Sequence, residues 1–379
     1  MAIQLSEHFT FKKLLKFVYP SIVMMIFTSI YSVVDGLFVS NFVGKTALAA
    51  INLILPFIMG LSALGFMMGT GGSAIVAKTL GEKKNKKANE YFSLIVYTTI
   101  IGGLAFSILG AILVRPVSIA LGANGKLLEN CVLYGRISFI SFMLQNVFQS
   151  FFVTAEKPKL GLFVIIAAGV TNMVLDYIFV ALLGFGLAGA AIATVCGECI
   201  GGLLPLFYFA RKNSSPLKLG KTHFYGKVLL RTCTNGSSEL MTNLSSSIVN
   251  SLYNLQLIKF AGENGVAAYG TIMYVNFIFV AIFIGYSIGS APIISYHYGA
   301  KNHDELKNLS KKSLTLICIW AVSIFALAQL LAAPASKLFV GYDQSLYKMT
   351  VSGFRIYCLA FLINGYNIFG SSFFTALNK

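Results

Sequence analysis

Charged residues are scarce in this chain. They make up only 11% of its 379 residues, whereas a soluble globular domain carries about one quarter. Hydrophobic residues make up 56%. A composition this poor in charge excludes an ordinary soluble domain and favours a protein embedded in a lipid bilayer.

The residue types on which catalysis and metal binding usually depend are also few. The chain has four histidines and six cysteines, and the cysteines lie in or beside apolar runs. Cys196 and Cys199 have C-x-x-C spacing, but they lie in an expected membrane helix, where thiols pack as small hydrophobic groups. No phosphate-binding loop or nucleophile–base pair is present. The sequence therefore predicts neither an enzyme nor a protein that needs a cofactor.

Acidic residues are outnumbered by basic ones, 13 to 29, which gives a formal net charge of +16. A basic protein can bind nucleic acid, but here the basic residues lie almost entirely between the apolar runs. None of the basic stretches is interleaved with aromatic residues as nucleic-acid-binding segments are. We therefore expect no nucleic-acid partner.

What the chain does have is a series of apolar runs of about 20 residues, each long enough to cross a bilayer as a helix. The first run, 17–43, is too long for a cleaved signal peptide and contains Asp35. We predict ten spans, at 17–43, 47–76, 91–114, 132–154, 160–183, 187–210, 232–258, 266–295, 313–335 and 350–376.

The basic residues alternate in density between successive connections. If the N-terminus is cytoplasmic, 21 of the 29 basic residues face the cytoplasm, as the positive-inside rule requires. We therefore expect a multi-pass protein of the cell (plasma or inner) membrane. The longest connection, 211–231, is rich in basic residues and contains Ser-Ser-Pro, which predicts a cytoplasmic linker between an amino-terminal six-helix lobe, 1–210, and a carboxy-terminal lobe, 232–379.

An internal repeat supports this division. Residues 44–83 align with 262–301 at an offset of 218, which places Gly81 over Gly299 and Lys83 over Lys301. Such a repeat predicts an all-α polytopic fold of two related helical bundles around a central cavity. The first unit has six spans and the second only four. We therefore expect ten of twelve helices, with the carboxy-terminal lobe truncated.

Four acidic residues lie inside the predicted spans: Asp35, Asp176, Glu198 and Glu239. A charge at the bilayer centre costs about 2.5–3.5 kcal/mol on insertion scales, so these side chains should face protein or water. Other polar residues share their helical faces and predict a polar cavity. The candidates for lining it are Tyr31, Gln145, Gln149, Glu198, Glu239, Asn243 and Asn250.

No Lys or Arg lies near the middle of the spans that carry these acids. Each carboxyl can therefore take up a proton, since desolvation disfavours its charged form, or bind a cation from outside. Either choice would oppose the binding of a cationic substrate, which is the physical basis of antiport. Alternatively, a lone membrane acid can hydrogen-bond a neighbouring helix, and Asn and Ser can serve helix packing alone.

Several stretches of the chain resemble the multidrug and toxic compound extrusion (MATE) family, in particular its prokaryotic multidrug exporters. They are "YSVVDGLFVSNFVGKTALAA" (31–50), "AAGVTNMVLDYIFV" (167–180), "GLAGAAIATV" (186–195), "AGENGVAAYG" (261–270) and "SAPIISYHYGAKN" (290–302). The resemblance implies two six-helix lobes, alternating access, and exchange of Na⁺ or H⁺ for organic, often cationic and aromatic, drugs.

The resemblance also implies roles for particular residues. Pro20 matches a proline at which the first helix bends, and Glu239 matches an acid of the carboxy-terminal lobe. The tenth span has no acid, so a second cation site that pairs two acids is not expected. The implied cation site, for Na⁺ or H⁺, consists of Asp35, Asn172, Asp176 and Thr194.

Three hypotheses follow. The first is a monomeric, cation-coupled exporter of cationic drugs, with Na⁺ and H⁺ both open as the coupling ion. The second is a flippase for a lipid-linked precursor from the same wider superfamily, although such a cavity is usually basic and this one is acidic. The third is an inactive truncated transporter or a membrane scaffold.

Overall fold

In the computed structural model, residues 3–140, 144–341 and 343–378 are described, and they form helices without any strand. The elements run in the order α1 Phe11–Phe38, η1 Val39–Val43, α2 Lys45–Gly81, α3 Asn85–Ala120, α4 Gly125–Ser138, α5 Leu144–Thr154, α6 Pro158–Asp176, η2 Tyr177–Leu182, α7 Gly186–Ala210, α8 Gly226–Gly299, α9 His303–Val340, α10 Gln344–Tyr357, η3 Cys358–Ala360 and α11 Phe361–Ala376.

The predicted spans correspond to these helices with a few differences. The seventh and eighth spans are one element, α8, which turns back on itself at Gly262, where φ is 62°. The fourth span is divided between α4 and α5, and the end of the linker predicted at 211–231 is wrong because α8 already begins at Gly226. Among the described residues, eight helices are long and apolar enough to cross a membrane.

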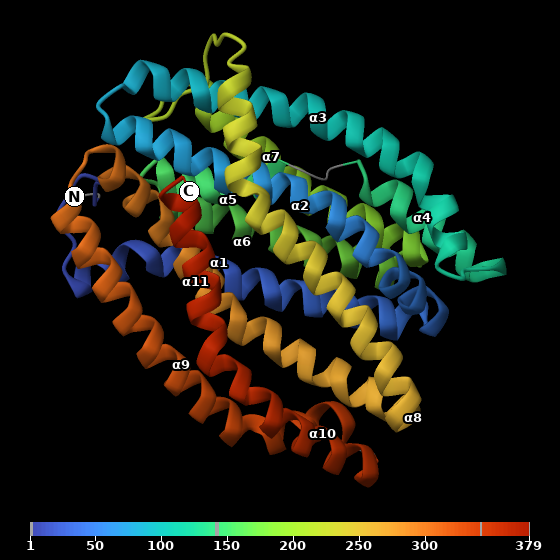
Figure 1. Ribbon diagram of the computed structural model, residues 1–379. Helices are drawn as coiled ribbons and strands as arrows, with labels where there is room; N and C mark the ends of the chain where they lie inside the picture. The colour runs from blue at the N-terminus through green and yellow to red at the C-terminus, as the bar shows by residue number, and fades with distance from the viewer. Residues whose placement is uncertain (1–2, 141–143, 342, 379) are drawn as a thin grey trace.

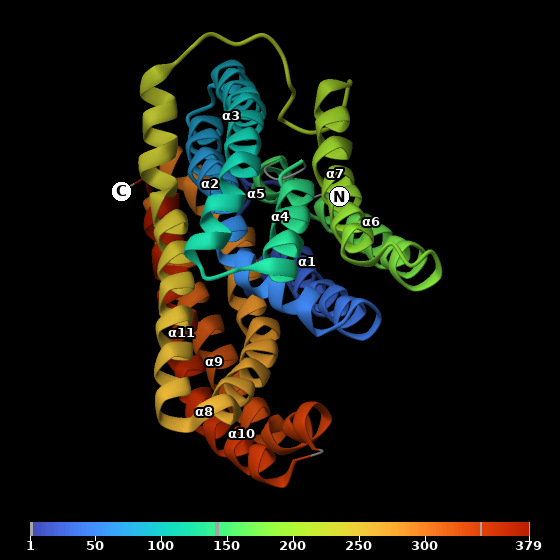
Figure 2. The same ribbon diagram turned by 90° about the vertical axis from the view of Figure 1, so that its right-hand side faces the viewer.

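The helices form two bundles (Figures 1 and 2). In the first, α1 packs on α6, α6 on α7, and α2 on α3, α4 and α5. In the second, α8 packs on α9, α10 and α11. The bundles meet where α1 and α2 contact α8, and the tips of α1 and α6 lie well away from α10 (Figure 2). This arrangement confirms the all-α fold of two helical bundles predicted from the sequence.

The contact between α2 and α8, here called the seam, depends on glycine. A Cβ atom on Gly81 would lie 2.0 Å from the carbonyl oxygen of Tyr296, and one on Gly299 would lie 2.0 Å from that of Lys78. Any larger residue would therefore force the backbones apart. Two further glycines approach the opposite backbone as closely along the same seam, Gly71 and Gly236.

The repeat seen in the sequence recurs in the backbone. Gly44 precedes α2 with φ of 108°, and Gly262, 218 residues later, divides α8 with φ of 62°. Lys83 and Lys301 follow the ends of α2 and α8, and both have positive φ, 60° and 56°. The two bundles therefore use the same turns at equivalent places, as related repeats should.

The N-terminal segment, residues 3–10, ties the two bundles together at one end of the molecule. The Leu5 N–H donates to the Glu156 carboxylate of the first bundle, at 2.7 Å. The Phe9 N–H donates to the Glu305 carboxylate of the second, at 2.9 Å. Burial raises the pKa of Glu156, which the bond from Leu5 partly opposes.

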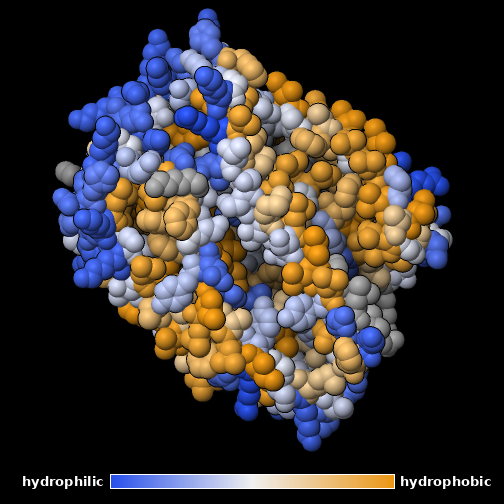
Figure 3. Space-filling model, viewed as in Figure 1, coloured by the Kyte–Doolittle hydropathy of each residue, from blue (hydrophilic) through white to orange (hydrophobic). Residues whose placement is uncertain are grey.

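We call this end the basic end, because the α2–α3 turn, the α5–α6 turn and the α8–α9 turn meet there and carry many lysines. Hydrophilic surface gathers around it at the upper left of Figure 3, and a broad apolar surface lies beyond it. The distribution fits a protein whose waist contacts lipid and whose ends contact water.

Candidate functional site

The centre of the candidate site is a pair of polar residues on α6, one helical turn apart. Asp176 is completely buried and Asn172 is 2% exposed. Neither oxygen of Asp176 and neither polar atom of the Asn172 side chain has a hydrogen-bond partner within the described part of the chain. Buried polar groups are nearly always satisfied, so this pair is the first candidate in the fold for contact with a bound ion or substrate.

Asp35 approaches this pair from α1. Its carboxyl interacts with both Asp176 and Asn172. The approach depends on Gly169 of α6, where a Cβ atom would lie 2.8 Å from the ring of Tyr31 on α1. The structure therefore brings together three of the four residues predicted for the cation site.

Thr194, the fourth predicted residue, lies on α7, which packs against α6. Its hydroxyl donates to the Ala190 carbonyl, at 3.1 Å, and the oxygen lone pairs stay available. On the same helix Gly197 lies against α6, where a Cβ atom would be 3.1 Å from the Cβ of Asn172. Glycine at this position lets α7 support the Asn172 side chain at close range.

A π-helical turn follows each of the two aspartates. After Asp35, the Gly44 N–H donates to the Val39 carbonyl, and after Asp176 the Leu183 N–H donates to the Ile178 carbonyl. Such turns are rare and occur frequently at functional sites. Each bond spans an extra residue, so the side chains beyond it rotate to a new face and the polar face ends at the aspartate.

Polar groups from α1, α4, α5 and α7 surround the carboxyls. Tyr31 interacts with Gln145 of α5, with Glu198 of α7 and with Asp35. Gln145 and Gln149 are both buried, with side-chain oxygens that accept no hydrogen bond from described residues. The candidates from the first bundle therefore gather around one region, apart from Gln149, which lies one turn further along α5 between residues of an aromatic cluster.

Sequence reasoning missed Tyr134 of α4. This buried side chain interacts with Asp35, Asp176 and Glu198, and with Ser138 one turn further along α4. The polar pair Tyr134 and Ser138 at i, i+4 could have indicated an inward face. It was obscured because α4 is less apolar than the other spans.

No Lys, Arg or His among the described residues forms an ion pair with Asp35 or Asp176. The three ion pairs there join His8 to Glu305, Lys13 to Glu7 and Lys84 to Glu82. The described residues also contain no cluster of three or more His, Cys, Asp and Glu side chains that could hold a metal. Carboxylate, amide and hydroxyl oxygens are nevertheless suitable ligands for a hard cation such as Na⁺.

The candidates of the second bundle lie on the first half of α8. The Asn243 amide donates to the Glu239 carbonyl at 2.8 Å, and the Asn250 oxygen accepts a bond from Tyr269 at 2.7 Å. Both amides therefore already have protein partners, unlike Asn172. Helix α1 continues through Pro20 without interruption.

Comparison with known proteins agrees with this architecture. The sequence model of the MatE family matches residues 20–178 and 240–379. The chain is 24% identical to the Multidrug export protein MepA of Staphylococcus haemolyticus, over 95% of this chain and 80% of that protein. It is 23% identical to the MepA of Staphylococcus aureus strain N315, over 94% of this chain and 79% of that protein.

Solved structures share the fold. A multidrug resistance MATE family transporter of the MOP superfamily in its outward-facing conformation superposes with a TM-score of 0.92 at 21% identity, covering 99% of this chain and 84% of that one. A second structure is a MOP superfamily transporter from Pyrococcus furiosus, described as having a binding pocket of reverse polarity. It superposes with a TM-score of 0.90 at 22% sequence identity, and again covers 99% of this chain and 84% of that one. From the family match and the two-bundle fold, we conclude that the chain belongs to the MATE family of multidrug efflux transporters.

Proposed function

We propose that this protein exports organic, cationic and aromatic drugs in exchange for Na⁺ or H⁺ by alternating access. The observation that carries the proposal is the Asp35–Asp176 pair, in which Asp176 is completely buried and neither carboxyl has an ion-pair partner within the described residues. Because the acids need positive charge from a solute, a coupling ion and a cationic drug compete for them.

In this mechanism the coupling ion binds at Asp35, Asn172, Asp176 and Thr194 when the site faces outward. Na⁺ would release the drug by taking its place beside the carboxylates, and H⁺ would release it by neutralising a carboxylate. When the site faces inward the ion leaves and the carboxylates hold the next drug. Tyr31, Gln145 and Glu198 lie beside the acids and suit the polar lining of the drug cavity.

We further propose that the basic end faces the cytoplasm, with the N-terminus there, in the cell membrane. The concentration of 21 of the 29 basic residues on one side supports this orientation. The glycine seam holds the bundles together at that end, so the conformation described here is outward-facing. We propose a monomer with lobes at 1–210 and 232–379.

Drug efflux from proteoliposomes tests the proposal when Na⁺ and pH gradients are imposed separately. We expect efflux of an ethidium-like dye with one of the two gradients. Asp35→Asn should abolish efflux while leaving insertion intact, and Glu129→Gln, which removes an exposed carboxyl of α4, should not. Full efflux by Asp35→Asn would refute the mechanism.

The flippase hypothesis is less well supported. The Pyrococcus furiosus structure is described as having a binding pocket of reverse polarity, so polarity can differ within this fold. The acidic site described here favours a cation over an anionic pyrophosphate. Binding of a lipid pyrophosphate in preference to a cationic dye would reverse this choice.

A further inference from the structure

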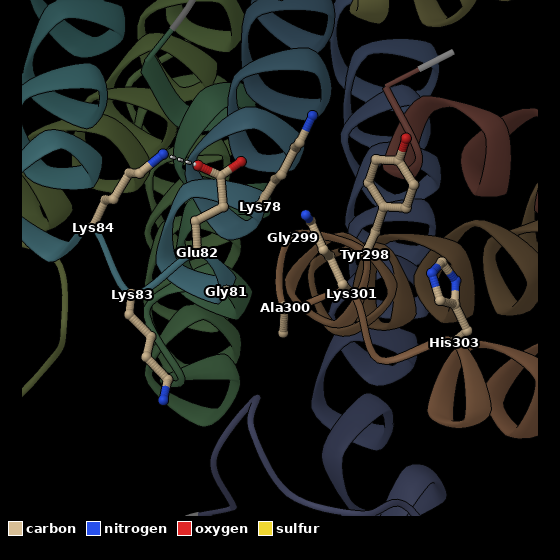
Figure 4. Close-up of a pocket in the computed structure, with 10 residues that line it drawn as sticks. All are labelled: Lys78, Gly81, Glu82, Lys83, Lys84, Tyr298, Gly299, Ala300, Lys301 and His303. Carbon is tan, nitrogen blue, oxygen red and sulfur yellow. Dashed lines mark hydrogen bonds and ion pairs between the residues drawn. The ribbon is translucent and has the colours of Figure 1, made fainter.

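A basic pocket of about 780 Å³ lies at the outer end of the seam, where α2 and α8 end (Figure 4). The first bundle contributes Lys78, Lys83 and Lys84 to its lining, and the second contributes Tyr298, Lys301 and His303. The pocket has the opposite charge to the Asp35–Asp176 site. Its lining contains four lysines and one carboxylate, Glu82.

Three of the four lysines have no carboxylate partner within the described residues. Glu82 pairs with Lys84, at 2.7 Å, which leaves Lys78, Lys83 and Lys301 unpaired by any described acid. The Lys78 ammonium lies over the Tyr298 ring, 5.2 Å from its centre. In Figure 4 the side chains of Lys78 and Lys301 both extend into the space between the two helix ends, and that of Lys83 extends away from them.

The helix dipoles do not cancel this positive charge. The C-terminal ends of α2 and α8 each contribute about half a negative charge. However, α3 begins at Asn85 and α9 at His303, each within four residues of the preceding helix end, and the positive ends of these helices offset the effect. The pocket therefore retains an excess of positive charge from its lysines.

We propose that this pocket binds a phosphate-bearing anion that bridges Lys78 of the first bundle and Lys301 of the second. Lysine binds phosphate as a compact point charge with three donors. The volume is sufficient for a small phosphorylated group. The anion is either the headgroup of an anionic phospholipid, since the helix ends lie where headgroups gather, or a soluble phosphate compound.

The anion stabilises the joined arrangement of the two bundles. Lys78 lies three residues before Gly81, and Lys301 lies two residues after Gly299, so the glycine contacts of the seam set the separation of the two backbones that carry these lysines. A ligand that binds the joined state more tightly than the separated one shifts the population toward it. This consequence rests on the proposed alternating access, whereas the binding site itself does not.

Binding is tested on the purified full chain with two probes. One is phosphatidylglycerol in nanodiscs that otherwise contain phosphatidylcholine, measured as the ratio of the two lipids retained. The other is inorganic pyrophosphate, titrated calorimetrically in neutral detergent. Retention of phosphatidylglycerol alone identifies a lipid headgroup as the ligand, and binding of pyrophosphate alone identifies a soluble one. Binding of neither overturns the proposal.

The variants decide whether the pocket is responsible. Lys78→Gln combined with Lys301→Gln should weaken binding about a hundredfold, since each of the two lost charged contacts is worth about tenfold. Lys86→Gln combined with Lys87→Gln removes the same charge from exposed positions of α3 outside the pocket and should leave binding within about twofold. Equal losses in both pairs would mean diffuse surface attraction and overturn the site. Lys301→Gln alone, at an exposed position, is the substitute if the first pair does not fold.

The bridging claim has its own test. Gly81→Ala removes no charge but separates the helix ends, so it should weaken binding as the lysine variants do. Gly102→Ala, at a position with open space around the added methyl group, should not. Native binding by Gly81→Ala would refute the bridge. Asp35→Asn should keep native binding although it loses transport, which separates this proposal from the proposed function.

Discussion

The glycine seam makes a quantitative prediction about the balance between the two states of the transporter. In Gly81→Ala the new methyl carbon would lie 2.0 Å from the Tyr296 carbonyl oxygen. Side-chain carbons almost never come within 3.0 Å of such an atom, so the helices must separate by about 1 Å. Overpacking of this kind costs about 1–3 kcal/mol. The ratio of joined to separated bundles should therefore fall about 5- to 150-fold.

Native Cys233 reports this change. It lies on α8 in the seam, half-buried, with its sulfur 3.9 Å from that of Met68 on α2. In a background whose other cysteines are alanine, the maleimide labelling rate of Cys233 should rise in Gly81→Ala, because separation of the bundles exposes a thiol that is half-buried in the joined state. Gly102→Ala, which meets nothing within 4 Å, should label at the native rate. An unchanged rate in Gly81→Ala, with the protein correctly folded, would refute the view that the seam holds the bundles closed.

Three further predictions concern single contacts. Glu305→Ala removes the acceptor that fixes the N-terminal segment and should cost about 1.5–3 kcal/mol of stability; thermal unfolding in detergent should show a lower midpoint, with the exposed neighbour Asp304→Ala as control. Tyr134→Phe removes a buried hydroxyl that interacts electrostatically with the carboxyls and should shift the ion concentration for half-maximal efflux; an unchanged value argues against its place in the site. Gly197→Ala adds a methyl group in tight contact with Asn172 and should weaken binding of the coupling ion about tenfold. Native ion affinity would contradict the packing argument.

The spans could be predicted because a helix that crosses lipid must be long and apolar, and such a helix is visible in the sequence as one continuous apolar run. The internal repeat was visible for a similar reason, since Lys83 and Lys301 occupy the same unusual turn in both halves. The division of the fourth span into α4 and α5 was not predicted, because hydropathy does not distinguish a broken helix from a continuous one. Nor was the early start of α8, which lies in a basic stretch typical of a linker.

The candidate site was partly predictable. Asp35, Asn172 and Asp176 stand out in the sequence because a polar residue in lipid is costly. Tyr134 does not stand out, because only the packing of α4 brings it within electrostatic range of the carboxyls. The bridging pocket depends on Lys78 and Lys301, which are far apart in the chain and read as ordinary headgroup anchors until the seam brings their helices together.

The central claim is that one pair of carboxylates serves either a coupling ion or a cationic drug. The most direct measurement is the affinity of the purified protein for an ethidium-like dye, titrated at increasing Na⁺ concentration and, separately, at decreasing pH. The account predicts that one of these cations weakens dye binding in a competitive manner, and that Asp35→Asn removes the effect. Dye affinity that is independent of both cations in the native protein would contradict it.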